Sequence, residues 1–297
     1  MLGTQFRAMG SSMQVLLDAD GAAAAAAVQQ SSAWFAVWEN LFSRFSDTSE
    51  LSRLNQAGEA RVSRPLWQLV QTACKMAEAT EGRVVPTLLP QMEAAGYRES
   101  FDWQQFWHHT DDGLPPSAGD WRRIEFDPTR RIIRLNGNRL DLGGVAKGWC
   151  AEQLADKLAG WGAVLVDAGG DIATRGSHTW QVAVAHPLQA GQEAGEISLS
   201  SGAVATSGSD YRCWQQNGRR MHHLIDPDTG RPSESDIVSV TVCAGDAVSA
   251  EAAAKTALLL GSSRIAGYFA AHRPFSACWF TRQGGMFHTD SFPWITS

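Results

Sequence analysis

The sequence lacks an excess of positive charge, a paired-cysteine motif and any apolar run of membrane length. Its formal net charge of −6 argues against nonspecific nucleic-acid binding, because such binding needs a basic surface. The five cysteines are odd in number and have no CxxC spacing, so we expect reduced thiols and no zinc site. A basic segment followed by an apolar one is missing near residue 1, so we expect no membrane association and a cytoplasmic location.

What the sequence does contain is enough apolar material for a large core. Of its 297 residues 44% are hydrophobic, which suits one large domain or two intimately packed subdomains. Predicted strands and helices are mixed along the chain without a regular βαβ repeat. We therefore predict the α+β class and a single domain over residues 1–297, with two intimately packed subdomains as the alternative.

The hydrophobic pattern locates most of the expected elements. Helical spacing of apolar residues predicts helices at residues 22–42, 65–79, 246–260 and 262–271. Strands are predicted at residues 13–17, 163–166, 172–174, 180–185, 196–200, 202–205 and 237–243. Hairpins are predicted from residues 121–126 with 131–135 and from residues 275–280 with 284–288.

A stretch at residues 141–171 is predicted to form, in order, a glycine-rich turn, a helix, a strand and a second glycine-rich turn. It begins with Asp141 and Gly143-Gly144, continues through Lys147 into the helix, and ends in a second glycine turn flanked by acids. Backbone N–H groups at a helix start, with a lysine nearby, suit a phosphate. The acids suit a sugar, a metal or only a turn, and the glycines could equally serve tight helix–strand packing. The pattern is neither GxGxxG nor a P-loop, so it does not decide between these alternatives.

A second polar group of residues invites a hydrolase interpretation. Ser207, His223 and Asp226 are the residue types of a catalytic triad. We discount this interpretation because no GxSxG elbow is present and closeness in sequence does not build a triad. Asp226 also opens an Asp-Pro-Asp-Thr-Gly segment, in which a turn role is sufficient.

Eight segments in one order carry a family resemblance. They read AMGSSMQV, FSRFSDTSELSRLN, TEGRVVPT, DLGGVAKG, VDAGGD, AVATSG, HHLIDPDTG, and SVTV followed by a helix ending in LLLG. Along nearly its whole length the chain resembles the ApbE-type flavin transferases, the FAD:protein FMN transferases. The resemblance implies an ApbE-like fold of mixed sheets with packed helices. It also implies FAD as ligand and Mg²⁺-assisted transfer of FMN to a Ser or Thr hydroxyl of an acceptor protein, with release of AMP.

The resemblance also implies roles for individual residues. Contacts to the flavin ring and ribityl chain would come from Met9, Phe45 and the turn of Val85, Pro86 and Thr87. Asp141 and Lys147, near Ile225, would hold the adenosine and phosphate side, and the Gly144 carbonyl would be a metal ligand. His223 or Asp226 is the candidate general base.

The chain departs from the family pattern at the proposed metal site. The family usually has an aspartate and, four residues later, a threonine, where this chain has Glu251 and Lys255. Residues four apart share a helix face, and this order favours an ion pair. Glu251 could be a carboxylate ligand in a looser Mg²⁺ site of an active transferase. Alternatively, Lys255 could replace the ion in an FAD-binding protein with little or no transfer. Val85 is a second departure, because many members carry an aspartate there.

Overall fold

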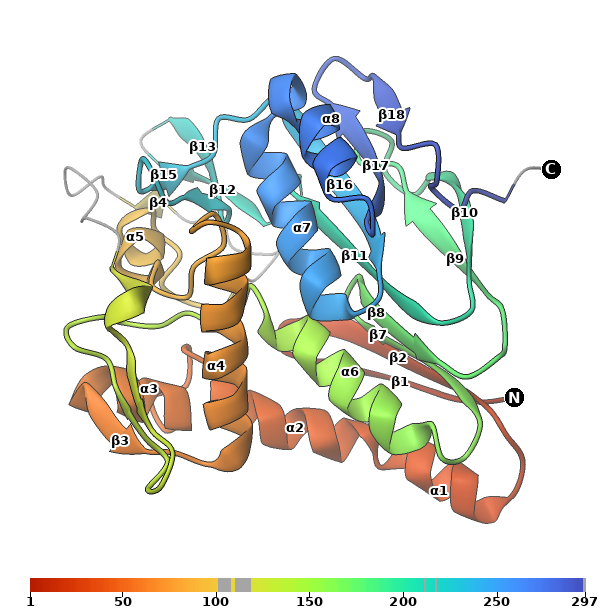
Figure 1. Ribbon diagram of the computed structural model, residues 1–297, viewed down its shortest axis with the longest axis horizontal. Helices are drawn as coiled ribbons and strands as arrows, with labels where there is room; N and C mark the ends of the chain where they lie inside the picture. The colour runs from red at the N-terminus through yellow and green to blue at the C-terminus, as the bar shows by residue number, and fades with distance from the viewer. Residues whose placement is uncertain (101–107, 110–118, 211, 217, 296–297) are drawn as a thin grey trace. The chain divides into compact units, whose positions relative to one another are not determined.

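The structure is a computed structural model that describes residues 1–100, 108–109, 119–210, 212–216 and 218–295 (Figure 1). The chain divides into two compact units. The first unit comprises Met1–Ala36, Lys147–Gly208 and Ser235–Ser297, and the second comprises Val37–Ala146 and Ser209–Glu234. Helices occur together with several mostly antiparallel sheets, which confirms the α+β prediction.

The first unit is built on an eight-stranded sheet whose neighbouring strands are all antiparallel. In spatial order the strands are β1 (Leu2–Ala8), β2 (Ser11–Asp18), β7 (Ala163–Ala168), β8 (Asp171–Arg175), β11 (Gly202–Gly208), β16 (Ile237–Ala244), β17 (Ser276–Thr281) and β18 (Met286–His288). Each predicted strand in this set is found within a few residues of its expected bounds. The register pairs Met13 with Ala168 and Asp171 with Ala205, so the β1–β2 and β7–β8 turns lie at the same end of the sheet.

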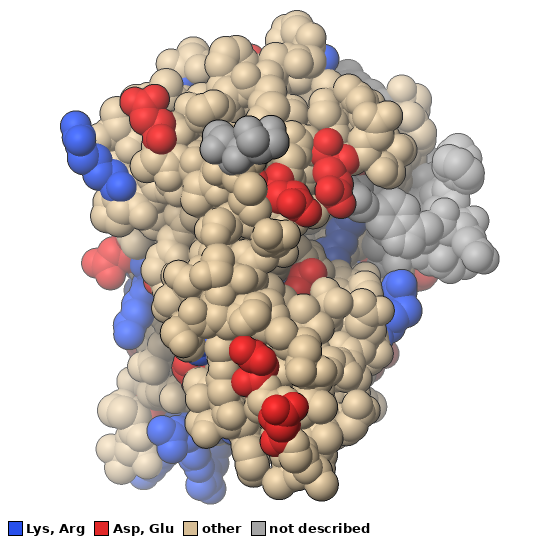
Figure 2. Space-filling view, turned by 90° about the vertical axis from the view of Figure 1, so that its right-hand side faces the viewer, with Lys and Arg blue, Asp and Glu red and all other residues tan. Residues whose placement is uncertain are grey.

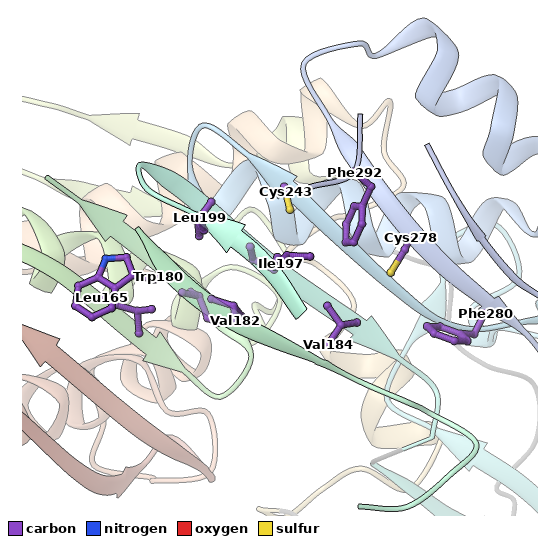
Figure 3. Packing of buried hydrophobic residues seen from close by; sticks show 12 residues of the cluster. Leu165, Trp180, Val182, Val184, Ile197, Leu199, Cys243, Cys278, Phe280 and Phe292 are labelled. Carbon is purple, nitrogen blue, oxygen red and sulfur yellow. The ribbon is translucent and has the colours of Figure 1, made fainter. Parts of the chain in front are cut away.

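A separate hairpin completes the apolar core of the first unit. It consists of β9 (Trp180–Ala185) and β10 (Glu193–Leu199), and the side chains of β9 alternate between buried and exposed. Figure 3 shows its buried residues lying among side chains from the large sheet. The cluster contains Trp180, Val182, Val184, Ile197 and Leu199 of the hairpin with Leu165, Cys243, Cys278, Phe280 and Phe292. The alternation along β9 therefore gives this strand one apolar face.

Four helices belong wholly or mainly to the first unit. They are α1 (Ala22–Gln29), α6 (Ala146–Leu158), α7 (Ala247–Leu260) and α8 (Ser262–Ala271). Helix α7 lies along β11 and β16 (Figure 1). Its start is fixed by the Asp246 carboxylate, which accepts the Ser249 N–H at 2.7 Å. Alanines dominate its buried side, so the helix can approach the sheet closely.

The second unit combines helices with small sheets. Its helices are α3 (Glu50–Ala57), α4 (Arg64–Ala79), α5 (Leu89–Ala94) and the 3₁₀ helix η1 (Trp121–Arg123), while α2 (Ser31–Phe42) runs into it from the first unit. Its strands are β3 (Glu59–Arg61), β4 (His108–His109), β5 (Glu125–Asp127), β6 (Ile132–Arg134), β12 (Cys213–Gln216), β13 (Arg219–His222), β14 (Ile225–Asp226) and β15 (Arg231–Pro232). They form the sheets β3-β6-β5, β13-β12-β4 and β14-β15.

Two local predictions were wrong in detail. Residues 22–42 form two helices. The first helix ends at Gln29, and the Ser32 hydroxyl donates to the Gln29 carbonyl where the helix is interrupted. Serine side chains compete in this way with the backbone bonds of a helix. Residues 121–126 begin as a 3₁₀ helix, since Asp120 accepts the Arg122 N–H and starts a turn before β5. In the described part of the chain, no helix has the length and apolar content needed to cross a bilayer.

Candidate functional site

Charge is sparse on the face of the described residues that Figure 2 shows. Most of that surface is uncharged, and its acidic side chains stand singly or in small groups. Exposed ion pairs contribute little to stability and fix little geometry. The charged residues that the fold buries are therefore more informative, and each unit contains such a group.

In the first unit, Met9 occupies a strained turn between β1 and β2. Ala8 pairs with Ser11, which leaves Met9 and Gly10 as a two-residue loop. Both have positive φ, 49° at Met9 and 69° at Gly10, as a type I′ turn requires. A left-handed conformation is uncommon for methionine, and such strain often accompanies a ligand site. The predicted contact of Met9 with flavin stays a prediction.

The neighbouring β7–β8 turn gathers Lys147 and two aspartates. Asp167 accepts the Gly170 N–H at 2.7 Å, and burial raises the pKa of Asp167. The Lys147 ammonium, from the first turn of α6, forms an ion pair with the carboxylate of Asp171, whose side chain is only 2% exposed. Lys147 also donates to the Ala168 carbonyl at 3.3 Å. The lysine that the sequence assigns to phosphate thus has a carboxylate partner within its own unit.

Helix α7 carries a second buried ion pair. The Lys255 ammonium donates to Glu251 Oε1 at 2.6 Å, and the two side chains are 15% and 5% exposed. Glu251 Oε2 is buried, and none of the described residues forms a hydrogen bond with it. Burial raises the pKa of Glu251 to about 7; the charge of Asp171 adds to the rise, whereas Lys255 and Lys147 oppose it. The predicted i, i+4 pair is therefore present, and it lies in the interior.

The contact of α6 with α7 positions this pair. Gly148 of α6 lies against α7, so that a Cβ there would stand 3.2 Å from the Ala247 carbonyl and 3.4 Å from Glu251 Oε2. One turn later, the carboxylate of Glu152 accepts the Ala247 N–H at 2.7 Å. Glu152 thereby satisfies a backbone donor at the start of α7. Glycine at 148 allows the close approach, and Glu152 fixes where α7 begins.

In the second unit, Asp141 holds a buried arginine. Arg44 Nε lies 2.5 Å from Asp141 Oδ2, and the arginine side chain is only 4% exposed. The other Asp141 oxygen accepts the Gly143 N–H at 2.9 Å, and the Asp141 N–H donates to the Pro86 carbonyl. Asp141 thus ties together the glycine turn that contains Gly144, the Pro86 turn and Arg44.

Above this ion pair lies a run of aromatic rings. The Arg44 guanidinium is 4.1 Å from the Phe45 ring centroid and 4.6 Å from that of Tyr97. Phe45 meets Tyr97 edge to face at 5.5 Å, and Tyr97 stacks on Trp214 at 5.6 Å. Tyr97 and Trp214 are buried, whereas Phe45 is 38% exposed. Phe45 therefore offers an aromatic surface on a rigid base to a flat apolar ligand.

The other residues of the second unit with predicted ligand contacts include Ile225, predicted near the adenosine side, and the turn residues Val85 and Thr87. Ile225 is buried with Tyr97 and Trp214, and Val85 packs against them. Thr87 is fully buried, and its hydroxyl donates to the Gly119 carbonyl at 2.7 Å. Thr87 therefore shapes the turn from within the fold. Whether any of these residues touches a flavin stays a prediction.

The two candidate bases have different surroundings. Asp226 Oδ1 accepts the Asp228 N–H at 2.9 Å, and its carbonyl accepts the Gly230 N–H, so Asp226 closes the turn of the Asp-Pro-Asp-Thr-Gly segment. Next to His223, the buried His222 contacts the Ser233 carbonyl at 2.8 Å. The half-buried His223 is not tied to that turn by any of these contacts. The choice between His223 and Asp226 stays open.

Sequence reasoning missed several residues that organise these groups. Arg44, Tyr97 and Trp214 were not candidates, although Arg44 directly precedes Phe45 in FSRFSD. An arginine among aromatic residues is a typical cation–π partner, and that signal was available. Gly148 and Glu152 were missed because their importance depends on a helix about 100 residues away.

The comparisons with known proteins agree on one family. The sequence model of the ApbE family matches residues 9–279. The chain is 30% identical over 250 residues to the FAD:protein FMN transferase of Treponema pallidum (strain Nichols), a match that covers 75% of this chain and 68% of that protein. It is 26% identical over 273 residues to the FAD:protein FMN transferase of Escherichia coli (strain K12), which covers 87% and 78%.

Solved structures share the fold. The ApbE protein of Thermotoga maritima superposes with a TM-score of 0.85 at 23% identity, covering 97% of each chain. The flavin transferase ApbE of Vibrio cholerae gives a TM-score of 0.76 at 21% identity, covering 99% of each chain. At such identities the likeness shows the fold alone. Because the family model spans most of the sequence and relatives align over three quarters of it, this chain belongs to the ApbE family.

Proposed function

We propose that this chain is an FAD:protein FMN transferase, which moves FMN from FAD to a Ser or Thr hydroxyl of an acceptor protein and releases AMP. The observation that carries the proposal is the family match over residues 9–279, together with relatives that are named for this activity. The alternative of a protein that only binds FAD is not favoured, because no relative reported above is named as one.

The reaction is a phosphoryl-type transfer without redox change. The acceptor hydroxyl oxygen forms a bond to the phosphorus of the FMN half. The bond from that phosphorus to the AMP phosphate oxygen breaks, and AMP leaves with the bonding electron pair. The hydroxyl proton passes to a base, for which His223 or Asp226 is proposed. Catalysis then depends mainly on positioning the diphosphate and on neutralising the charge that develops on AMP.

The flavin ring would lie against the aromatic run of the second unit. Phe45 is exposed, rests on Tyr97 and is held from below by the Arg44–Asp141 ion pair. Because the buried side chains of Tyr97 and Arg44 hold the Phe45 ring in place, the ring can bind a flat ligand with little loss of side-chain freedom. Val85, Pro86 and Thr87 would border the ring, and Met9 is the remaining predicted contact to the flavin half, whereas Ile225 would lie near the adenosine and phosphate side.

For the diphosphate, Asp141 and Lys147 are the proposed residues of the adenosine side. Gly144 and Glu251 are the predicted ligands if magnesium takes part. The contacts of Glu251 do not suit a divalent ion, because one oxygen already accepts from the Lys255 ammonium. Within the described residues, no group of three or more His, Cys, Asp or Glu is placed to hold a metal. No step given above depends on magnesium.

We also propose a cytoplasmic location. The cysteines are thiols that form no disulfide among the described residues, and burial raises the pKa of the Cys243 and Cys278 thiols, which lowers their reactivity. Free thiols are typical of a reducing compartment. Fractionation of the source cells, followed by immunodetection, would test this part of the proposal.

The transfer is tested by following both products. The purified chain is incubated with FAD and a lysate, AMP is measured by chromatography, and the proteins are separated on a denaturing gel that is scanned for flavin fluorescence. We expect AMP release and a fluorescent band, with the FMN mass on a Ser or Thr in peptide mass spectrometry. FAD that stays intact, with no labelled band, would contradict the proposed function.

A further inference from the structure

We propose that the ammonium of Lys255 is the cation that neutralises the diphosphate in this chain, so that the transfer needs no divalent metal ion. The inference rests on the proposed function and concerns the group formed by Lys147, Asp171, Glu251 and Lys255, which we call the four-charge cluster. All four residues belong to the first unit.

The first step is that each carboxylate of the four-charge cluster already has an ammonium partner. Asp171 is paired with Lys147, and Glu251 is paired with Lys255. The two pairs interact, since Asp171 and Lys147 both influence the pKa of Glu251. A divalent ion bound at Glu251 would stand close to an ammonium, and such repulsion is strong where water is excluded. The cluster therefore provides two carboxylates but no place for two further positive charges.

The second step concerns the position of the ammonium within the pair. Lys255 keeps 15% of its side chain exposed, whereas Glu251 keeps 5%. The Lys255 ammonium donates to Glu251 Oε1. The Lys255 side chain is therefore the more accessible member of the pair. A phosphate approaching the pair would meet the positive charge.

The third step is that the Glu251–Lys255 ion pair is not explained by a contribution to folding stability. The surrounding α7 residues are buried alanines, including Ala250, Ala252 and Ala254. A buried ion pair is often no more stable than apolar residues of similar volume. Among the residues that the structure describes, Glu251 Oε2 moreover has no hydrogen-bond partner, and a buried oxygen without one costs free energy. A structural role does not explain why charge is kept there, whereas phosphate neutralisation does.

An ammonium in place of a metal ion has a consequence for the chemistry. When the phosphorus–oxygen bond to AMP breaks, negative charge builds up on the leaving phosphate oxygen. Lys255 would stabilise that oxygen as a single charge, but an ammonium cannot bridge two oxygens and align them as a metal ion can. The phosphate oxygens must then be aligned by contacts other than that with Lys255. We therefore expect an active enzyme whose rate does not respond to divalent ions.

The experiment combines turnover with direct metal binding. AMP release from FAD by the wild-type chain is compared in excess EDTA and in millimolar MgCl₂. Binding of Mn²⁺ to the FAD-loaded protein is followed by electron paramagnetic resonance. For the wild type we expect rates equal within about twofold and no bound Mn²⁺. Lys255→Thr, which removes the ammonium and supplies a hydroxyl, should bind Mn²⁺ and should release AMP only when Mg²⁺ is present.

Further variants separate a chemical from a structural role. Lys255→Met with Glu251→Gln removes both charges without leaving a buried carboxylate, and circular dichroism checks that it folds. We expect AMP release to fall at least a hundredfold, with no recovery in Mg²⁺. Lys157→Met is the matched control, because Lys157 is exposed on α6 and contacts only the Trp34 ring among the contacts described. It should keep the wild-type rate.

Each outcome decides between the two proposals. Turnover abolished by EDTA, or stoichiometric Mn²⁺ in the wild type, would overturn the inference and leave the transferase function standing. Full EDTA-resistant activity of the folded double variant would also overturn it, since Lys255 would then be structural. If no condition gives AMP, the proposed function fails. The Mn²⁺ spectra of the wild type and Lys255→Thr then still show whether the lysine excludes the ion.

Discussion

Gly148 and Glu251 come from two different helices and meet where α6 crosses α7. A Cβ on Gly148 would lie 3.4 Å from Glu251 Oε2 and 3.2 Å from the Ala247 backbone. This single glycine therefore sets how closely α7, with its buried ion pair, approaches α6. A side chain at this position moves either the helix or the carboxylate.

The first prediction follows from that contact. Inside a helix, Gly→Ala normally stabilises by about 1 kcal/mol, but at Gly148 the new methyl group meets packed atoms. Overpacking of this kind costs about 1–3 kcal/mol, so we expect Gly148→Ala to be neutral or destabilising and to slow AMP release. Urea unfolding and AMP chromatography measure the two effects.

Gly267 supplies the matched control for Gly148. It lies inside α8, and a Cβ there would have nothing within 4 Å. We expect Gly267→Ala to stabilise the chain by about 0.5–1 kcal/mol without changing turnover. If the two variants behave alike, the α6–α7 contact does not constrain the site.

The second prediction concerns the Arg44–Asp141 ion pair in the second unit. Asp141→Asn leaves a guanidinium that is 4% exposed without its carboxylate. Breaking a buried pair from one side costs about 3–5 kcal/mol, so we expect a loss of that size in the free energy of unfolding. The exposed Arg139–Glu93 pair serves as the control. Glu93→Gln should cost less than about 1 kcal/mol, and equal losses for the two variants would contradict the assigned burial.

The sequence predicts elements with local signals well. Helix α7 begins one residue from its expected start, because the Asp246 cap and Gly261 mark its ends. Prediction from sequence is weaker where a helix boundary depends on competing side-chain hydrogen bonds, as at Ser32, where the helix predicted over residues 22–42 is interrupted. Local pattern therefore gives the fold class and most strands.

Pairings between distant residues could not be read from local pattern. Lys147 meets Asp171 only because the β7–β8 turn brings the start of β8 to the first turn of α6. Arg44 pairs with Asp141 although the two residues lie far apart in the sequence. Only the i, i+4 pair of Glu251 and Lys255 was visible beforehand, because helical spacing is a local rule. Site residues predicted by resemblance remain predictions of ligand contact.

The third prediction uses the pKa of Glu251. Folding raises this pKa from 4.5 to about 7, mainly through burial, so the folded state binds the proton more tightly than the unfolded state. The resulting stabilisation is complete below pH 4.5 and is lost as the pH rises through about 7. Relative to Glu251→Gln, which cannot titrate, the wild type should therefore lose stability over this range and then level off.

Urea unfolding of both proteins at half-unit steps from pH 5 to 8 measures this difference. Titrating groups that do not interact with Glu251 affect both proteins alike and cancel in the comparison. Glu193→Gln, at an exposed position on β10, is the control and should follow the wild type throughout. A wild-type curve parallel to that of Glu251→Gln would mean that Glu251 is not desolvated.

The fourth prediction tests the aromatic platform through flavin binding. Phe45→Ala removes the exposed ring that rests on Tyr97 and Arg44, and an aromatic contact is worth about 0.5–1.5 kcal/mol beyond its buried area. We expect the dissociation constant for FAD to rise about five- to tenfold, as measured by quenching of flavin fluorescence. Phe287→Ala is the control, because Phe287 is also exposed and stacked on one aromatic ring, that of Trp279. It should bind FAD as the wild type does. Unchanged FAD affinity in Phe45→Ala would contradict stacking of the flavin on Phe45, because a flavin that stacks on this side chain binds more weakly when the side chain is removed.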